Sequence, residues 1–204
     1  MKKKNDIFTI IIFILIGAAL FGFTYYTVKD EFVKEETVEK KLISLDLYGY
    51  SLKVRDTELF KTNFKDLEKV LNENPIDYSK YAELASKLFI IDLFTLSNKT
   101  TSTDIGGLEF VHKDLKENFK ENMGASLYKN VVSNLDGKRT QKLPEVSSIE
   151  AEEPKEVKYK YAGTEYDAYE VKLKWEYKED LGYEKTLKVT LIKDSDKLFV
   201  VKGE

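Results

Sequence analysis

The longest uninterrupted apolar stretch of the chain lies close to its N-terminus. Between Ile7 and Val28 there are 22 consecutive residues without a charged side chain. A helix rises about 1.5 Å per residue, so this stretch can cross a hydrocarbon core about 30 Å thick. We therefore expect a transmembrane helix, whose apolar anchor residues and interfacial aromatic residues are Ile7, Ile11, Leu15, Leu20, Phe23, Tyr25 and Tyr26.

The charges on either side of this stretch predict its orientation. Three lysines at positions 2–4 precede it, whereas residues 29–41 mix acidic and basic side chains. Positive residues favour the cytoplasmic side, so we expect the short N-terminus in the cytoplasm and the rest of the chain outside it. The alternative is a cleaved signal peptide with a small-residue site at residues 17–19. The apolar run continues past that site and exceeds the usual core of about 7–15 residues, which favours a retained anchor.

After residues 1–28, the cytoplasmic tip and anchor, the sequence predicts a stalk and one domain. Residues 29–41 are charge-rich and carry no wide apolar stripe, which is typical of a solvated linker. The domain is expected over residues 42–204, a length within the usual range of about 100–200 residues for one domain. It opens with an extended arm from Leu42 to Lys53 that contains a turn around Gly49.

Two helices are predicted from apolar positions spaced by three and four residues. The first begins at Asp56, which we expect to cap it, and ends before the proline at position 75. Its apolar face is formed by Phe60, Phe64, Leu67 and Leu71. The second begins at Asp77 and ends at residues 97–98. Residues 88–96 are almost all apolar, so we expect this to be the most buried helix of the domain.

A third helical region is predicted after a polar loop at residues 99–107. Apolar residues recur every four positions from Val111 to Leu135. Because a helix has 3.6 residues per turn, such a row drifts around an unbroken helix, and we expect a bend near Gly124. A turn at residues 136–137 is expected to end the region.

The C-terminal part changes from helical periodicity to strict alternation. Aromatic and aliphatic residues occupy the odd positions from 169 to 177, and lysines and glutamates occupy the even positions between them. Alternation at residues 157–161 and 187–191, and an apolar stretch at residues 198–201, predict further strands separated by turns. With a first strand at residues 146–151, these strands form an antiparallel sheet with one solvated face. The domain is therefore expected to be α+β, with three or four helices packed on a curved sheet of four to five strands.

The order of these elements resembles that of the NTF2-like fold. With an N-terminal anchor, it is also similar in plan to the VirB8-type domains of type IV secretion systems and their Gram-positive conjugation counterparts. The segments that carry the resemblance are residues 89–94 (FIIDLF), 127–128 and 171–177 (VKLKWEY), within a matching region over residues 55–202. The resemblance implies an NTF2-like domain that acts as a scaffold in an envelope assembly, makes its contacts through helix and sheet surfaces, and needs no cofactor.

Composition narrows the range of functions. Residues 29–204 carry 30 lysine and arginine residues against 35 aspartate and glutamate residues, so a basic face for nucleic acid is not expected. The absence of cysteine excludes disulfides and thiolate metal sites. No dinucleotide, phosphate-loop or serine-hydrolase motif is present. We therefore expect a protein that is not an enzyme and that has no cofactor and no metal.

Asp92 is the strongest candidate for chemistry. A carboxylate on this apolar helix could lie in a cone-shaped cavity with a raised pKa, as a general base would need. The resemblance implies a similar role, because ketosteroid-isomerase-like enzymes use an acid within the same fold. The residues of such a pocket would be Asp92, Phe89, Trp175 and Tyr177. The alternative is that Asp92 is structural and bonds to tyrosine or backbone groups, or lies at the exposed edge of the helix.

The remaining candidates are expected to be structural. His112 is the single histidine, so it cannot form a histidine-rich metal site. The acidic groups at residues 150–153 and 194–196 do not follow the spacing of a calcium-binding loop. The glycine pair at residues 106–107 is expected to form a flexible turn. The aromatic residues left free for a partner are Tyr48, Tyr50, Tyr166 and Tyr183.

The sequence thus favours a binding function. We expect a single-pass protein of the cell membrane whose extracytoplasmic domain contacts another envelope protein or a second copy of itself, in a secretion-like, conjugation-like or other envelope assembly. The alternative is a domain that binds or hydrolyses a small molecule in a cone-shaped cavity, with Asp92 as acid or base.

Overall fold

The structure, a computed structural model, describes residues 41–204. The predicted transmembrane helix over residues 7–28, its anchor residues and the stalk as far as residue 40 lie outside the described residues. Within residues 41–204, no helix combines the length and the hydropathy needed to span a membrane.

The described chain begins with a β-hairpin. Strand β1 (Lys41–Leu45) pairs antiparallel with β2 (Tyr50–Lys53), so the segment predicted to be an extended arm folds back on itself. The turn between the strands ends at Gly49, whose φ of +63° lies in the region that favours glycine. Tyr50 and Leu52 are buried, and they attach the hairpin to the core.

Helix α2 (Glu58–Leu71) buries the four apolar residues that were predicted to form its inner face. Its N-cap is Thr57, whose hydroxyl accepts a hydrogen bond from the Phe60 N–H at 3.3 Å. The prediction that Asp56 caps this helix is therefore wrong. Asp56 instead accepts a hydrogen bond from the Lys53 N–H at 2.6 Å and closes the turn between β2 and α2.

Helix α3 (Tyr78–Phe94) is the central helix of the domain. Asp77 is its N-cap, as predicted, and accepts a hydrogen bond from the Lys80 N–H at 2.9 Å. The helix packs against α2 on one side and against strands of the sheet on the other, so it is buried on nearly all sides. It ends at Phe94, with Thr95 as its C-cap, a few residues before the predicted end at residues 97–98.

The third helical region is much shorter than predicted. A single 3-10 turn, η1 (Lys113–Leu115), leads into α4 (Lys116–Ala125), and no helix continues from there to residue 135. The helix ends one residue after Gly124. From there the chain passes through turns in which Tyr128 and Val131 are buried. Of the apolar row after residue 125, Leu127 is half-buried and Val131 is buried in a loop, whereas Leu135 is exposed.

Five strands form the main sheet, which is antiparallel throughout. They are β3 (Val146–Ala151), β4 (Lys155–Tyr161), β5 (Thr164–Tyr177), β6 (Thr186–Asp194) and β7 (Lys197–Gly203). The order is β3-β5-β6-β7, and β4 pairs with the N-terminal part of β5 while β3 pairs with its C-terminal part. β5 thus holds three strands together.

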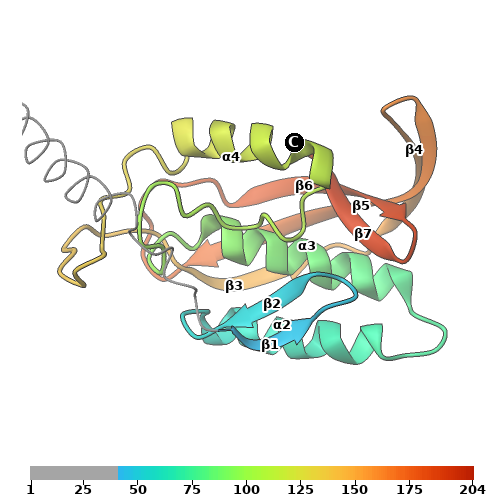
Figure 1. The fold of residues 1–204 in the computed structure, drawn as a ribbon, viewed down its shortest axis with the longest axis horizontal. Coiled ribbons are helices and arrows are strands. Elements are labelled where there is room, and N and C mark those ends of the chain that lie inside the picture. Colours follow the sequence, from blue (N-terminus) through green and yellow to red (C-terminus); the bar gives the residue numbers. More distant parts are fainter. Residues whose placement is uncertain (1–40) are drawn as a thin grey trace, which may run out of the picture. The chain divides into compact units, whose positions relative to one another are not determined.

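The alternation predicted for residues 169–177 is confirmed. The odd-numbered side chains from Tyr169 to Tyr177 are buried, whereas Lys172, Lys174 and Glu176 are exposed on the opposite face. Figure 1 shows α3 crossing in front of the strands, with α4 above it and with α2 and the β1–β2 hairpin below it. The domain is accordingly α+β, with three α-helices packed against a five-stranded antiparallel sheet.

Candidate functional site

Two regions could carry chemistry or binding. One is a network of charged and polar groups around Asp92, and the other is an apolar pocket between α3, α4 and β7. Within residues 41–204, no group of three or more histidine, aspartate or glutamate side chains is arranged to hold a metal ion. The acidic residues at 150–153 and 194–196 therefore do not form such a site.

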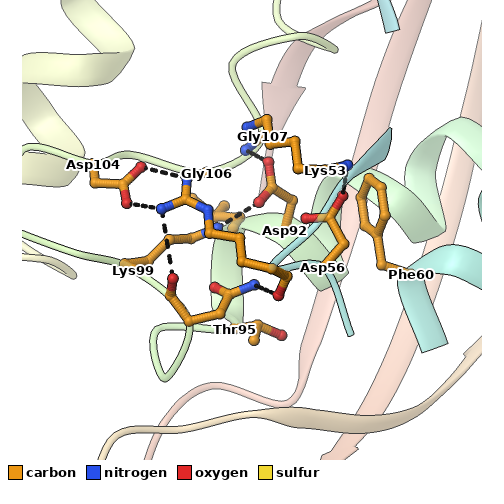
Figure 2. Close-up of polar contacts among 12 residues, drawn as sticks. Lys53, Asp56, Phe60, Asp92, Thr95, Lys99, Asp104, Gly106 and Gly107 are labelled. Atoms are coloured by element: carbon orange, nitrogen blue, oxygen red, sulfur yellow. Dashed lines mark hydrogen bonds and ion pairs between the residues drawn. The ribbon is translucent and has the colours of Figure 1, made fainter. Parts of the chain in front are cut away.

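Asp92 lies in the last turns of α3 and is bonded through both carboxylate oxygens. Oδ1 accepts a hydrogen bond from Nζ of Lys99 at 2.5 Å, and Oδ2 accepts one from the Gly107 N–H at 2.6 Å (Figure 2). The Lys99 side chain is only 1% exposed. A lysine buried to this degree needs a partner charge, and Asp92 supplies it.

The loop after α3 folds over Asp92 because it carries two glycines. A Cβ on Gly106 would lie 2.0 Å from the Asp92 carbonyl oxygen, so the loop backbone packs directly on the helix backbone. Gly107 has a φ of +78°, in the region that favours glycine, and its N–H donates to the Asp92 carboxylate. The predicted flexible turn is thus a buried, tightly packed contact.

The environment of Asp92 favours its charged form. Burial alone would raise the pKa of Asp92, but the charges of Lys99 and Lys53 and the Gly107 N–H outweigh it and hold that pKa below 3.8. A general base on this helix would need a raised pKa. Asp92 therefore has the surroundings of a structural ion pair.

A second ion pair fastens the same loop to the hairpin. The Arg55 guanidinium contacts both carboxylate oxygens of Asp104, one of them at 2.8 Å. Burial would raise the pKa of Asp104, but Arg55 and the Thr100 N–H hold it at about 2. Asn98 donates a hydrogen bond to the Arg55 carbonyl oxygen at 3.3 Å, which ties the loop to the turn that leads into α2.

Asp56 is the member of this network whose charge is least favoured. Its side chain lies beneath the turn that leads into α2, next to Phe60 in Figure 2. Burial, with a smaller contribution from the negative charge of Asp92, raises the pKa of Asp56 to about 6 against the lowering effect of the Lys53 N–H. Asp56 can therefore change its charge near neutral pH.

Tyr128 completes the network from the far side of the loop. Its fully buried hydroxyl donates to the Leu93 carbonyl oxygen at 2.7 Å and accepts from the Gly106 N–H at 3.0 Å. It links the end of α3, the glycine pair and the segment after α4. The polar composition of residues 99–107 concealed this arrangement, since the sequence does not show that Lys99 turns inward.

Lys197 is a further partly buried charged residue that the sequence pattern did not reveal. Its ammonium donates to the carbonyl oxygens of Tyr48 and Glu109, the latter at 3.1 Å, and lies 4.3 Å from the centroid of the Tyr50 ring. Burial lowers the pKa of Lys197 to about 8. It fastens the β1–β2 hairpin to the β6–β7 turn.

The apolar pocket has a volume of about 480 Å³ and opens between α3, α4 and the end of β7. Its polar lining residues are Asn118, Asn122 and Lys202. The remaining lining is apolar, apart from Gly203, and consists of Phe89, Leu93, Phe94, Val111, Leu115, Phe119, Met123, Leu187, Val200 and Val201. This volume and lining are typical of a site for a small apolar ligand.

The structure does not bring the four predicted pocket residues together. Phe89 lines the apolar pocket, but Asp92, Trp175 and Tyr177 do not. Trp175 is buried in the core against Phe94, with ring centroids 4.7 Å apart. The Tyr177 hydroxyl donates to the Glu184 carbonyl oxygen at 2.7 Å.

The other aromatic candidates and His112 are mostly enclosed. Tyr50 is fully buried, so the prediction that it is free for a partner is wrong. Its hydroxyl lies 2.8 Å from that of Tyr81. Tyr48, Tyr166 and Tyr183 are partly exposed.

His112 is buried, with its ring centroid 5.0 Å from that of Tyr161 and 5.2 Å from that of Phe199. Its Nδ1 accepts a hydrogen bond from the Asp114 N–H at the start of η1.

Comparison with known proteins gives no further constraint. No protein-family model, curated protein or solved structure matches the chain. Function must therefore be argued from the described residues and from the pattern of the sequence.

Proposed function

We propose that the chain is a single-pass membrane protein whose domain, residues 42–204, is an extracytoplasmic binding module of the cell envelope. The observation that carries the proposal is the uncharged run from Ile7 to Val28, preceded by three lysines and followed by a compact α+β domain. The buried Asp92–Lys99 pair and the half-buried Arg55–Asp104 pair support binding over catalysis, because each charge already has a protein partner.

We also propose that this domain is NTF2-like. Three helices, α2, α3 and α4, precede the main sheet, and α3 packs across β3, β5 and β7. β-bulges interrupt the register near Val146 and near Thr190, as expected of strands that curve around a helix. An envelope assembly of the secretion or conjugation type is the setting that this resemblance favours, with another envelope protein or a second copy of the chain as partner.

Membrane topology can be tested by placing a single cysteine in this cysteine-free chain. Lys120→Cys introduces a thiol on the exposed side of α4, and Asn5→Cys introduces one before the apolar run. In intact cells, a membrane-impermeant maleimide should label Lys120→Cys, whereas Asn5→Cys should react only after the membrane is permeabilised.

The opposite result would be decisive. If Lys120→Cys reacts only in permeabilised cells, or if the uncleaved chain is recovered in the soluble fraction, the extracytoplasmic placement is wrong. Recovery of a chain that lacks its first residues would instead support cleavage near residues 17–19.

The apolar pocket favours a second candidate function, the binding of a small apolar molecule. Its lining provides many apolar contacts, with amide groups of Asn118 and Asn122 among its polar groups. Asp92 does not line it, so an acid–base reaction there would need a different proton carrier.

A further inference from the structure

Strand β4 forms an open edge of the main sheet. Among the described residues it pairs with β5 alone, and its other edge has no backbone partner. Its residues are exposed or half-buried along its whole length. Figure 1 shows β4 at the periphery of the domain, away from α2 and α3. An edge of this kind can pair with a strand of another chain.

The turn between β4 and β5 determines which backbone groups face outward. It consists of Ala162 and Gly163, both with positive φ, and Tyr161 pairs with Thr164 on either side of it. In such a two-residue hairpin, the flanking pair exchanges both backbone hydrogen bonds, and alternate pairs repeat this pattern. The odd-numbered residues of β4 therefore direct their N–H and C=O groups toward β5. The three residues that direct theirs to the open edge are Glu156, Lys158 and Lys160.

These outward groups match a second copy of the same strand. In an antiparallel pair with its two-fold axis at Lys158, all three outward residues face an outward residue of the partner strand. Glu156 then lies opposite Lys160, and the symmetry repeats this pair of opposite charges on the other side of the axis. An axis at Tyr159 would place Lys158 opposite Lys160. An axis at Val157 would place Lys158 opposite Glu156, but it would place Lys160 opposite Pro154, which has no N–H to donate.

Lysines on an edge strand usually prevent pairing. Here the lysine at the two-fold axis, Lys158, forms an ion pair with Asp167 of its own β5 strand, which offsets the like charge of its symmetry mate. The other lysine in the register faces a glutamate. The charges of β4 thus oppose an axis at Tyr159 and permit the axis at Lys158, whereas Pro154 disfavours an axis at Val157.

We propose that β4 pairs antiparallel with β4 of a second copy of this chain, centred on Lys158, so that one sheet continues through both copies. This deepens the proposed function, since it rests on a binding role and names the partner. It does not depend on which side of the membrane the domain occupies. Its failure would therefore leave the maleimide result unaffected.

Disulfide capture of the full-length chain in native membranes tests the contact. Opposed residues of a hydrogen-bonded antiparallel pair have Cα atoms about 5.5 Å apart, within the range of a disulfide. Lys158→Cys should therefore form a disulfide-linked dimer under mild oxidation. Lys120→Cys, the same substitution on exposed α4, should form at least tenfold less.

Charge exchange in the Lys158→Cys background tests the register. Glu156→Lys or Lys160→Glu places like charges together twice, so each should slow dimer capture at least tenfold. The double variant with both substitutions restores opposite charges and should return capture close to its original rate. The proposal is overturned if Lys158→Cys is captured no faster than Lys120→Cys, or if the double variant is no better than the single ones.

Discussion

At the scale of single side chains, the pair formed by Asp92 and Lys99 has the largest energetic consequence. Both groups lie in or near the core, and their attraction compensates for the loss of hydration only while both are present. Removing one partner leaves the other as an unpaired buried charge. Substitution of Asp92 therefore reports on stability before it reports on any activity.

We expect Asp92→Asn to lower the free energy of unfolding of residues 41–204 by about 3 kcal/mol, because Lys99 loses its counter-charge. Urea unfolding followed by circular dichroism measures this. The matched control is Asp66→Asn, which breaks the exposed Asp66–Lys69 pair on α2 and should cost less than about 1 kcal/mol. Equal effects of the two substitutions would show that the buried pair does not stabilise the fold.

Asp56 gives a prediction about pH. Its pKa is raised to about 6 in the folded domain from an ordinary value of 3.8, so the folded state binds the proton more tightly than the unfolded state. The stability that the protonated Asp56 gives the folded state is fully present below pH 3.8 and is lost as the pH rises through about 6. The pKa of Asp104 shifts in the opposite direction, to about 2. The stability that Asp104 contributes therefore changes with pH only below this window, where it is lost as the pH falls toward about 2.

Asp56→Asn keeps an acceptor for the Lys53 N–H but cannot ionise. Relative to the unsubstituted domain, the variant should gain about 2 to 3 kcal/mol of stability between about pH 4 and about pH 7. Urea midpoints measured at several pH values test this. A difference between the two proteins that stays constant with pH would contradict the assigned shift.

Residue identity predicted some of these roles and missed others. Asp92 stood out because a carboxylate on an apolar helix is unusual, and its structural role was one of the two interpretations. Its partner Lys99 was not predictable, since it lies in a polar stretch that reads as a solvated loop. Thr57 and Asp56 are both good caps, and only the backbone direction after β2 selects between them.

At the scale of elements, periodicity succeeded where an element buries one regular face. It predicted α2, α3 and the alternation of β5, because each packs a continuous row of side chains on the core. It failed after Gly124, where Tyr128 and Val131 are buried by a loop. A four-residue spacing does not distinguish a helix from turns that return to the core at similar intervals.

The pocket beside α4 yields a prediction at this scale. Met123→Trp places a larger side chain in the pocket and should weaken binding of the uncharged apolar fluorophore N-phenylnaphthylamine about tenfold. Fluorescence titration measures the affinity. Glu121→Trp, on the exposed side of the same helix, should leave it unchanged. If neither variant alters binding, the fluorophore occupies another site and this pocket is not a ligand site.

At the scale of the whole molecule, the α+β class and the number of strands followed from the order of periodic segments. The arrangement of the strands did not. β3 and β4 lie end to end along one edge of β5, and this pairing depends on contacts between residues distant in the sequence. The close approach of residues 106–107 to α3 is also a product of tertiary packing.

The central place of β5 has a consequence for biogenesis. Ribosomes release the chain from its N-terminus, so α2 and α3 emerge well before β3, β5 and β7, the strands that pack on α3. Until the last strand is synthesised, the apolar surface of α3 has no sheet to pack on. A nascent chain bound for export would spend that interval unfolded, which suits passage through a narrow translocation channel and requires chaperones to shield it on the way.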